Sequence, residues 1–284
     1  MALLVNALVW GVSWWPFQSL QAQGLHPLWA TALVYGLSLL VIWALKPQAA
    51  RGWREHPGLW LLVLASGMTN VGFNWAVSIG DVVRVVLLFY LMPAWSIMIA
   101  WWLLSEKPTQ RSWLRLLLAL TGVAIVLKKP GTPWPIPESM ADALALMGGF
   151  CFALTNALLR KLHASPEPAR MLAMFGGGTV MASLTAVTGV SLGHIAPFPE
   201  LSGMWAPEVL ALSVAFLLGN LALQYGAARL SAQTTALVML SEIVFASLSA
   251  VYLGHGQLSE QTLWGGGLIV FAALMSIWPS HKEF

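Results

Sequence analysis

Glu242 is the only ionisable residue near the middle of any apolar stretch in this chain of 284 residues. The surrounding residues 232–254 carry no other charge, so in a helix rising about 1.5 Å per residue the carboxyl group lies roughly 15 Å from either end. Inside a lipid bilayer such a group normally faces a bundle interior or a watery cavity and marks a transport path. Its carboxylate could accept a substrate ammonium group or carry a proton. A neutral acid that is hydrogen-bonded to a neighbouring helix is the structural alternative.

Two pairs of amide side chains are the next candidates for binding. Asn70 and Asn74 are four residues apart, as are Asn220 and Gln224, so each pair shares one face of a helix. We expect these amides to bind the polar part of a substrate. Amides that only bridge helices remain an open alternative, because polar contacts between membrane helices contribute about 0.6 to 2 kcal/mol.

Aromatic residues and a proline add to the candidate site. Trp10 and Trp14 share a helix face in the first apolar stretch, whereas Tyr90 and Trp101 follow helical spacing in the fourth. We predict that these four residues form aromatic walls of the site, and tryptophans that face lipid or simply pack are the alternative. Pro93 removes a backbone hydrogen bond and usually kinks a helix, so we predict a hinge there, with a static bend as the alternative.

The composition indicates which elements must position these residues. Hydrophobic residues make up 58% of the chain and charged residues only 9%, against roughly 25% charged in a soluble domain. The mean hydropathy is +0.75, which is typical of an integral membrane protein. A window of about 20 residues, the length that crosses a bilayer, predicts ten helices: 3–22, 27–45, 57–78, 82–104, 110–128, 139–161, 168–190, 206–228, 232–254 and 260–279.

Several functional classes are disfavoured by the residues present. The single cysteine, Cys151, has no partner for a disulfide, and no Cys/His cluster suggests a metal site. No phosphate-binding loop occurs, and no connection is long enough for a nucleotide-binding domain. A membrane-embedded enzyme would need clustered acids, histidines or a nucleophile, which the sequence does not provide. We predict no enzyme activity, no cofactor, no metal and no nucleic-acid partner.

The distribution of basic residues predicts the orientation. With a cytoplasmic N-terminus, eleven of the fourteen Lys and Arg residues fall in inner segments, and only Arg84, Lys128 and Lys129 fall in outer ones. This bias follows the positive-inside rule, so we expect both termini in the cytoplasm. We further expect a monomer in a bacterial inner membrane.

An internal repeat divides the chain. A shift of 150 positions lays Asn70 on Asn220 and Trp95 on Phe245, and it places Pro93 opposite Ile243, beside Glu242. We therefore predict a first five-helix repeat over residues 1–129, a proline-rich linker over 130–138 and a second repeat over 139–284. An odd number of helices inserts the second copy in the opposite direction. Inverted repeats of this kind build transporters with a midplane site and alternating access.

The repeats carry a family resemblance. The segments Leu91-Met92-Pro93-Ala94-Trp95 and Leu103-Leu104-Ser105-Glu106-Lys107-Pro108-Thr109 in the first half, with Ser241-Glu242-Ile243-Val244-Phe245-Ala246 in the second, resemble the EamA-type carriers of the drug/metabolite transporter superfamily. Within it, Phe89-Tyr90-Leu91-Met92-Pro93 is similar to the YddG-type aromatic amino acid exporters. This resemblance implies an all-α membrane fold of ten helices around a central cavity, and export of amino acids, aromatic ones favoured, or related metabolites. A carrier for cationic drugs or other small metabolites is the alternative.

Overall fold

The structure is a computed structural model that describes residues 1–53, 55–105, 108–128, 136–199, 204–227, 241–254 and 259–277. Within these ranges the regular elements are all helical, as the composition predicts. Among the described residues, five stretches are long and apolar enough to cross a membrane, and shorter apolar helices accompany them. The membrane-embedded helical fold is therefore confirmed.

The long helices coincide with predicted spans. Their bounds are α3 Pro27–Leu45, α4 Gly58–Ile79, α8 Met140–Lys161 and α9 Glu167–Ser191. A further three are α7 Gln110–Leu127, α10 Ala206–Ala227 and α13 Glu260–Ile277. A short 3₁₀ helix, Pro47–Trp53, connects α3 toward α4. Polar caps set several of the starts: Thr109 accepts a hydrogen bond from the backbone N–H of Ser112, and Ser139 accepts one from that of Asp142.

Two predicted spans are interrupted, and each contains a proline. The first is divided into α1 Ala2–Val12 and α2 Trp14–Ala22 around Ser13. The fourth is divided into α5 Val82–Phe89 and α6 Met92–Leu104, with Tyr90 and Leu91 between them. Pro16 and Pro93 lack the N–H that would bond to the carbonyl four residues earlier, which explains why the regular helix fails on their N-terminal side. In the ninth predicted span the structure describes α12 Ser241–Tyr252, whereas residues 232–240 lie outside the described part.

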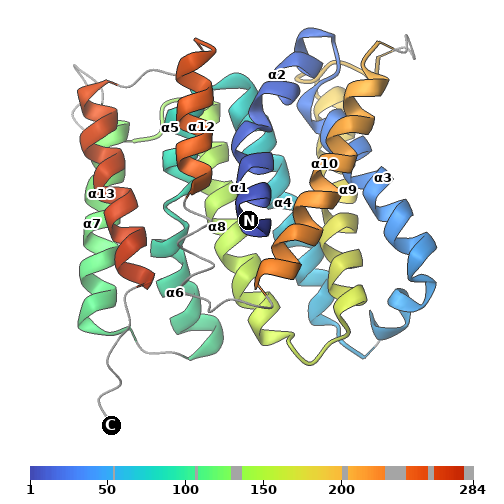
Figure 1. Cartoon of the computed structure of the whole chain (residues 1–284), viewed down its shortest axis with the longest axis horizontal. Helices are drawn as coiled ribbons and strands as arrows, with labels where there is room; N and C mark the ends of the chain where they lie inside the picture. The colour runs from blue at the N-terminus through green and yellow to red at the C-terminus, as the bar shows by residue number, and fades with distance from the viewer. Residues whose placement is uncertain are drawn as a thin grey trace.

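Helices from distant parts of the chain pack side by side (Figure 1). α7 and α13 form one edge of the molecule, and α3 and α9 lie together at the other. Between these edges, α1 packs against α10 and α12, while α4 packs against α8 and α9. Close approach requires glycine at one crossing: a methyl group at Gly122 of α7 would lie 2.6 Å from the carbonyl oxygen of Gly265 of α13.

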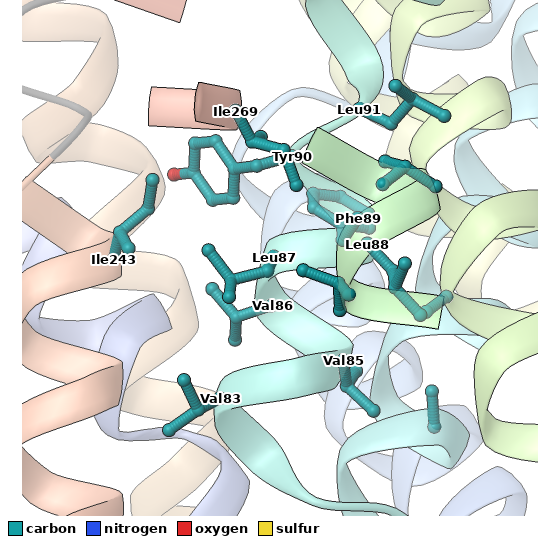
Figure 2. Close-up of a cluster of buried hydrophobic side chains, with 14 of the residues drawn as sticks. Val83, Val85, Val86, Leu87, Leu88, Phe89, Tyr90, Leu91, Ile243 and Ile269 are labelled. Carbon is teal, nitrogen blue, oxygen red and sulfur yellow. The ribbon is translucent and has the colours of Figure 1, made fainter. Parts of the chain in front are cut away.

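The largest buried apolar cluster surrounds the interrupted fourth span. Val83, Val86 and Leu87 of α5 are buried in it together with Ile243 of α12 and Ile269 of α13. Figure 2 shows these side chains between the neighbouring helices, with Tyr90 directed toward the helix that carries Ile243. The apolar packing therefore encloses the segment that contains the break.

Candidate functional site

Tyr90 and Glu242 form a buried pair between the first and second halves of the sequence. The Tyr90 hydroxyl donates a hydrogen bond of 2.9 Å to Oε2 of Glu242. The two residues are only 2% and 7% exposed. A carboxyl group that is removed from water requires such polar partners, because an unpaired buried charge is costly. The bond is therefore a well-defined polar centre in otherwise apolar surroundings.

The pair joins the break in the fourth span to α12. Tyr90 is the C-terminal cap of α5, and Glu242 lies among the first described residues of α12. Figure 1 places α5 in the upper part of the molecule and α6 in the lower part, so the break between them lies at intermediate depth. The sequence register predicts corresponding depths for Pro93 and Glu242, which stays a prediction; the structure brings Tyr90, three residues before Pro93, into contact with Glu242.

The backbone next to this pair lies close to glycines of neighbouring helices. Pro93 cannot donate to the carbonyl of Phe89, and a methyl group at Gly149 of α8 would lie 2.5 Å from that carbonyl oxygen. Similarly, a methyl group at Gly11 of α1 would lie 2.9 Å from the carbonyl oxygen of Glu242. The backbone at Phe89 and at Glu242 therefore packs against a helix from the other half of the sequence without room for a side chain.

Aromatic rings extend from the Tyr90–Glu242 pair across the molecule. Phe89 contacts Tyr90 and Phe73, with ring centroids 6.2 and 4.8 Å apart. The ring centroids of Phe73 and Trp10 lie 6.2 Å apart, and the Trp10 ring packs edge-to-face on that of Phe216 with centroids 4.6 Å apart. We call these five rings, Tyr90, Phe89, Phe73, Trp10 and Phe216, the aromatic row. Phe73, Phe89 and Phe216 are functional candidates that the sequence did not single out, because isolated phenylalanines in apolar helices give no periodic signal.

Trp14 has a different role from Trp10, although the sequence places both on one helix face. Its indole Nε1 donates a hydrogen bond of 2.9 Å to Oγ of Ser249 on α12. The side chain is 1% exposed and belongs to the largest apolar cluster. Trp14 thus connects α2 to α12 about two helical turns from Glu242.

The amides of the first half bridge helices. Asn70 accepts a hydrogen bond from the hydroxyl of Tyr35 on α3 and donates to the carbonyl oxygen of Ser66 at 2.8 Å. Asn74 donates to Oγ1 of Thr31 on α3 at 3.1 Å. Both amides are buried. These contacts correspond to the bridging alternative, and direct substrate binding by either amide stays a prediction.

The remaining predicted residues lie in different surroundings. Asn220 is partly buried on α10, and the side chain of Gln224 lies outside the described part of the structure. Trp101 on α6 is 54% exposed, so the structure does not place it in the buried centre with Tyr90. Pro93 lies in the first turn of α6, at the break where a hinge is predicted.

Arg84 and Asp142 form an ion pair that the sequence did not predict. Arg84 Nε lies 2.7 Å from Oδ1 of Asp142, and its Nη2 donates to Oδ2 at 3.0 Å. Arg84 also donates to the carbonyl oxygen of Val126 at the end of α7. Asp142 is almost completely buried, whereas Arg84 is partly exposed. No motif spacing could reveal this pair, because the contact depends on α5 and α8 being neighbours.

Comparison with known proteins gives a consistent class. Residues 1–128 match the EamA-like transporter family. An uncharacterized transporter of Pseudomonas aeruginosa is 30% identical over 122 residues, which cover 41% of this chain and 39% of that protein, so less than half of its length is matched. An S-adenosylmethionine uptake transporter of Rickettsia bellii is 23% identical over 228 residues, covering 78% of this chain and 72% of that protein.

A solved crystal structure supports the fold. It aligns with a TM-score of 0.60 and 18% identity, covering 97% of this chain and 94% of the other. At this identity the likeness concerns the arrangement of helices, which therefore extends over nearly the whole chain.

Proposed function

We propose that this chain, whose first 128 residues match the EamA-like transporter family, is a secondary carrier that moves amino acids or related small metabolites by alternating access. The observation that carries the proposal is the buried Tyr90–Glu242 hydrogen bond, which joins the two halves at a break in the fourth span. A polar pair of this kind offers a substrate ammonium group an acceptor that the surrounding apolar residues do not supply.

The aromatic row supports a cargo with a flat apolar group. Its rings begin at Tyr90 and continue to Phe216 without interruption. Aromatic faces and edges provide adaptable contact area, while a few polar groups fix the orientation of the ligand. We therefore favour an aromatic amino acid, whose ammonium group is held by Glu242 and whose ring lies against the row.

A cationic metabolite is the second candidate. The acid at the centre has a tyrosine hydroxyl as its described partner, and the related uptake transporter of Rickettsia bellii is named for S-adenosylmethionine. S-adenosylmethionine combines an amino acid group, a sulfonium charge and a flat adenine ring. A site with one carboxylate and an aromatic row suits these chemical features as well.

The packing of helices supports two interchangeable halves, residues 1–129 and 139–284. The repeat pairs α1 and α2 with α8, α3 with α9, α4 with α10, α5 and α6 with α12, and α7 with α13. If each helix is replaced by its repeat partner, the contact between α1 and α10 becomes the contact between α8 and α4, and both contacts are observed. In the same way, the contact between α1 and α12 becomes the observed contact between α8 and α6. The pairs α3–α9 and α7–α13 are converted into themselves. Rocking of two such halves about a central site is the expected transport movement.

The membrane orientation follows the charges. Lys46, Arg160, Lys161 and Arg170 lie at helix ends opposite to the end that carries Arg84. We therefore assign the former end to the cytoplasm of a bacterial cell, with both termini on that side. We call the opposite end, which carries the first turns of α5 and α8, the outer end. A monomer contains all the residues of the proposed site.

The test is flux in reconstituted vesicles. Purified protein should move labelled phenylalanine or tryptophan faster than empty vesicles do, and unlabelled S-adenosylmethionine added as a competitor separates the two cargo candidates. Glu242→Gln should lower the flux by about 10-fold to 100-fold, because hydrogen bonds to a charged group contribute about 1.5 to 3 kcal/mol. Glu260→Gln, at an exposed acid in the first turn of α13, is the matched control and should behave like the parent.

Two outcomes would contradict the site and the cargo separately. If Glu242→Gln transports at the parental rate, the carboxyl group is not part of the transport site, although the carrier function would still stand. Absence of flux for every labelled amino acid, together with rapid movement of S-adenosylmethionine, would establish the second candidate. An imposed pH difference distinguishes the driving force, since accumulation of cargo against its gradient requires proton coupling.

A further inference from the structure

We propose that Arg84 and Asp142 form a clasp that holds the outer ends of α5 and α8 together and biases the carrier toward the conformation closed on that side. This inference rests on the proposed function, because it assumes that the two halves move relative to each other. It adds a determinant of the resting state, which the central site by itself does not provide.

The geometry of the clasp is that of a strong ionic contact. Two guanidinium nitrogens of Arg84 reach the two carboxylate oxygens of Asp142, at 2.7 and 3.0 Å. Asp142 also accepts a bond from the backbone N–H of Glu138 at 3.4 Å. Paired, planar contacts of this type fix orientation as well as distance. Separation of α5 from α8 would leave a nearly buried carboxylate without its cation, which is strongly unfavourable.

The clasp connects segments that belong to different halves. Arg84 lies in the first half and binds the end of α7 through the carbonyl oxygen of Val126, while Asp142 lies in the first turn of α8 in the second half. The outer end has a second connection between the halves, because Glu208 of α10 accepts bonds from Ser19 and Gln23 of α2 at 3.1 and 2.7 Å. Opening of the outer end therefore requires these polar contacts to break.

The repeat positions that correspond to Arg84 and Asp142 carry uncharged residues in the sequence. The shift of 150 positions lays Arg84 on Thr234, and residues 230–240 contain no lysine or arginine. For Asp142, the corresponding residue follows from the glycines. Gly11 and Gly149 both pack on a backbone carbonyl of the opposite half, so we treat them as equivalent. Leu4 precedes Gly11 by the same number of residues as Asp142 precedes Gly149, and therefore corresponds to Asp142. Helix α1 carries no charged side chain. The sequence therefore carries the two charges of the clasp in one copy of the repeat, and Leu4 and Thr234 at the corresponding positions of the other.

This asymmetry has a consequence for the conformational equilibrium. In a carrier made of two equivalent inverted halves, the inward-open and outward-open states would have similar free energies. A contact that exists only when the outer end is closed lowers the free energy of the inward-open state selectively. The resting protein should therefore be mostly closed on the outside, and loss of the clasp should increase the outward-open population.

The experiment measures accessibility without any substrate. In a Cys151→Ser background, which removes the single native cysteine, Ala145→Cys places a reporter on α8 one turn beyond Asp142, at a position that is completely buried. A membrane-impermeant maleimide is added to the outer side of intact vesicles, and the labelling rate is recorded. Asp142→Asn should increase this rate about tenfold, which corresponds to about 1.4 kcal/mol. Glu260→Gln serves as the matched acid-to-amide control.

Exchange of the two charges separates the clasp from general destabilisation. The double variant Arg84→Asp with Asp142→Arg restores an ion pair and should return the labelling rate toward that of the parent. A folded Asp142→Asn protein, monodisperse by gel filtration, that labels at the parental rate would overturn the proposal. If Asp142→Asn does not fold, a folded charge-exchange protein decides instead: parental labelling supports the clasp, and tenfold faster labelling overturns it. Since labelling needs no cargo, failure of the proposed transport activity would leave this result unaffected.

Discussion

Two buried tyrosines make similar hydrogen bonds in very different surroundings. The hydroxyl of Tyr90 binds the carboxyl group of Glu242, and that of Tyr35 binds the amide oxygen of Asn70. The first bond joins residues 152 positions apart, at a break in a helix, and its acceptor is ionisable. The second joins residues 35 positions apart in two continuous helices, α3 and α4, and its acceptor is neutral.

The difference indicates that burial and hydrogen bonding by themselves do not identify a transport site. Tyr35 and Asn70 hold neighbouring helices of one half together, which is the ordinary function of polar contacts between membrane helices. Tyr90 and Glu242 connect two halves that must separate or rotate if access alternates. We infer that the Tyr90–Glu242 contact changes during transport, whereas the Tyr35–Asn70 contact persists.

Between the two tyrosines, the larger effect should follow from removal of the Tyr90 hydroxyl. Tyr90→Phe keeps the ring in the aromatic row but leaves the Glu242 carboxyl group without its described donor, so flux in reconstituted vesicles should fall by about tenfold. Tyr252→Phe is the matched control, since Tyr252 is 89% exposed. Equal flux in both variants would show that the hydroxyl contributes nothing to transport.

An intermediate effect should distinguish the break from a continuous helix contact. Gly149 packs on the carbonyl of Phe89 at the break, and Gly177 of α9 packs equally closely on the carbonyl of Val63 in α4. Forced insertion of a methyl group typically costs about 1 to 3 kcal/mol at either place. We expect Gly149→Ala to reduce the flux several-fold more than Gly177→Ala at comparable thermal stability, with Gly267→Ala as the control because nothing lies within 4 Å of its added methyl group.

If Gly177→Ala impaired the flux as strongly as Gly149→Ala, the break would have no special part in the movement. Flux and melting temperature measured on the same preparations separate the two effects. A variant with parental stability and slow flux is affected in its movement, whereas a variant with both values lowered is affected in its folding.

Much of the fold could be predicted from the sequence because lipid restricts the possible structures. The expected span 27–45 corresponds to α3 Pro27–Leu45, and that at 57–78 to α4 Gly58–Ile79. Within a bilayer the backbone must satisfy its own hydrogen bonds, so long apolar runs become helices and prolines mark their interruptions. Hydropathy and proline positions therefore carried most of this information.

For the candidate site, the sequence offered only the register of the predicted repeat. That register predicts Glu242 at the depth of Pro93, and in the structure Tyr90, beside Pro93, contacts Glu242. It could not specify which helices are neighbours, so the Arg84–Asp142 contact and the partners of Asn70 were missed. It also could not determine how a side chain is oriented about its helix. The exposure of Trp101 was therefore not predicted, because its spacing matched that of Tyr90.

The smallest effect on flux should come from Tyr35. Tyr35→Phe removes the donor to Asn70, but the amide keeps its bond to the carbonyl oxygen of Ser66 and the phenyl ring keeps its contact with Phe216. The free energy of unfolding should fall by about 1 kcal/mol, within the range measured for polar contacts between membrane helices. Flux should stay close to the parental value, because this contact lies within one half. A Tyr35→Phe protein with parental stability and strongly reduced flux would place Tyr35 in the transport path, and the distinction between the two tyrosines would then fail.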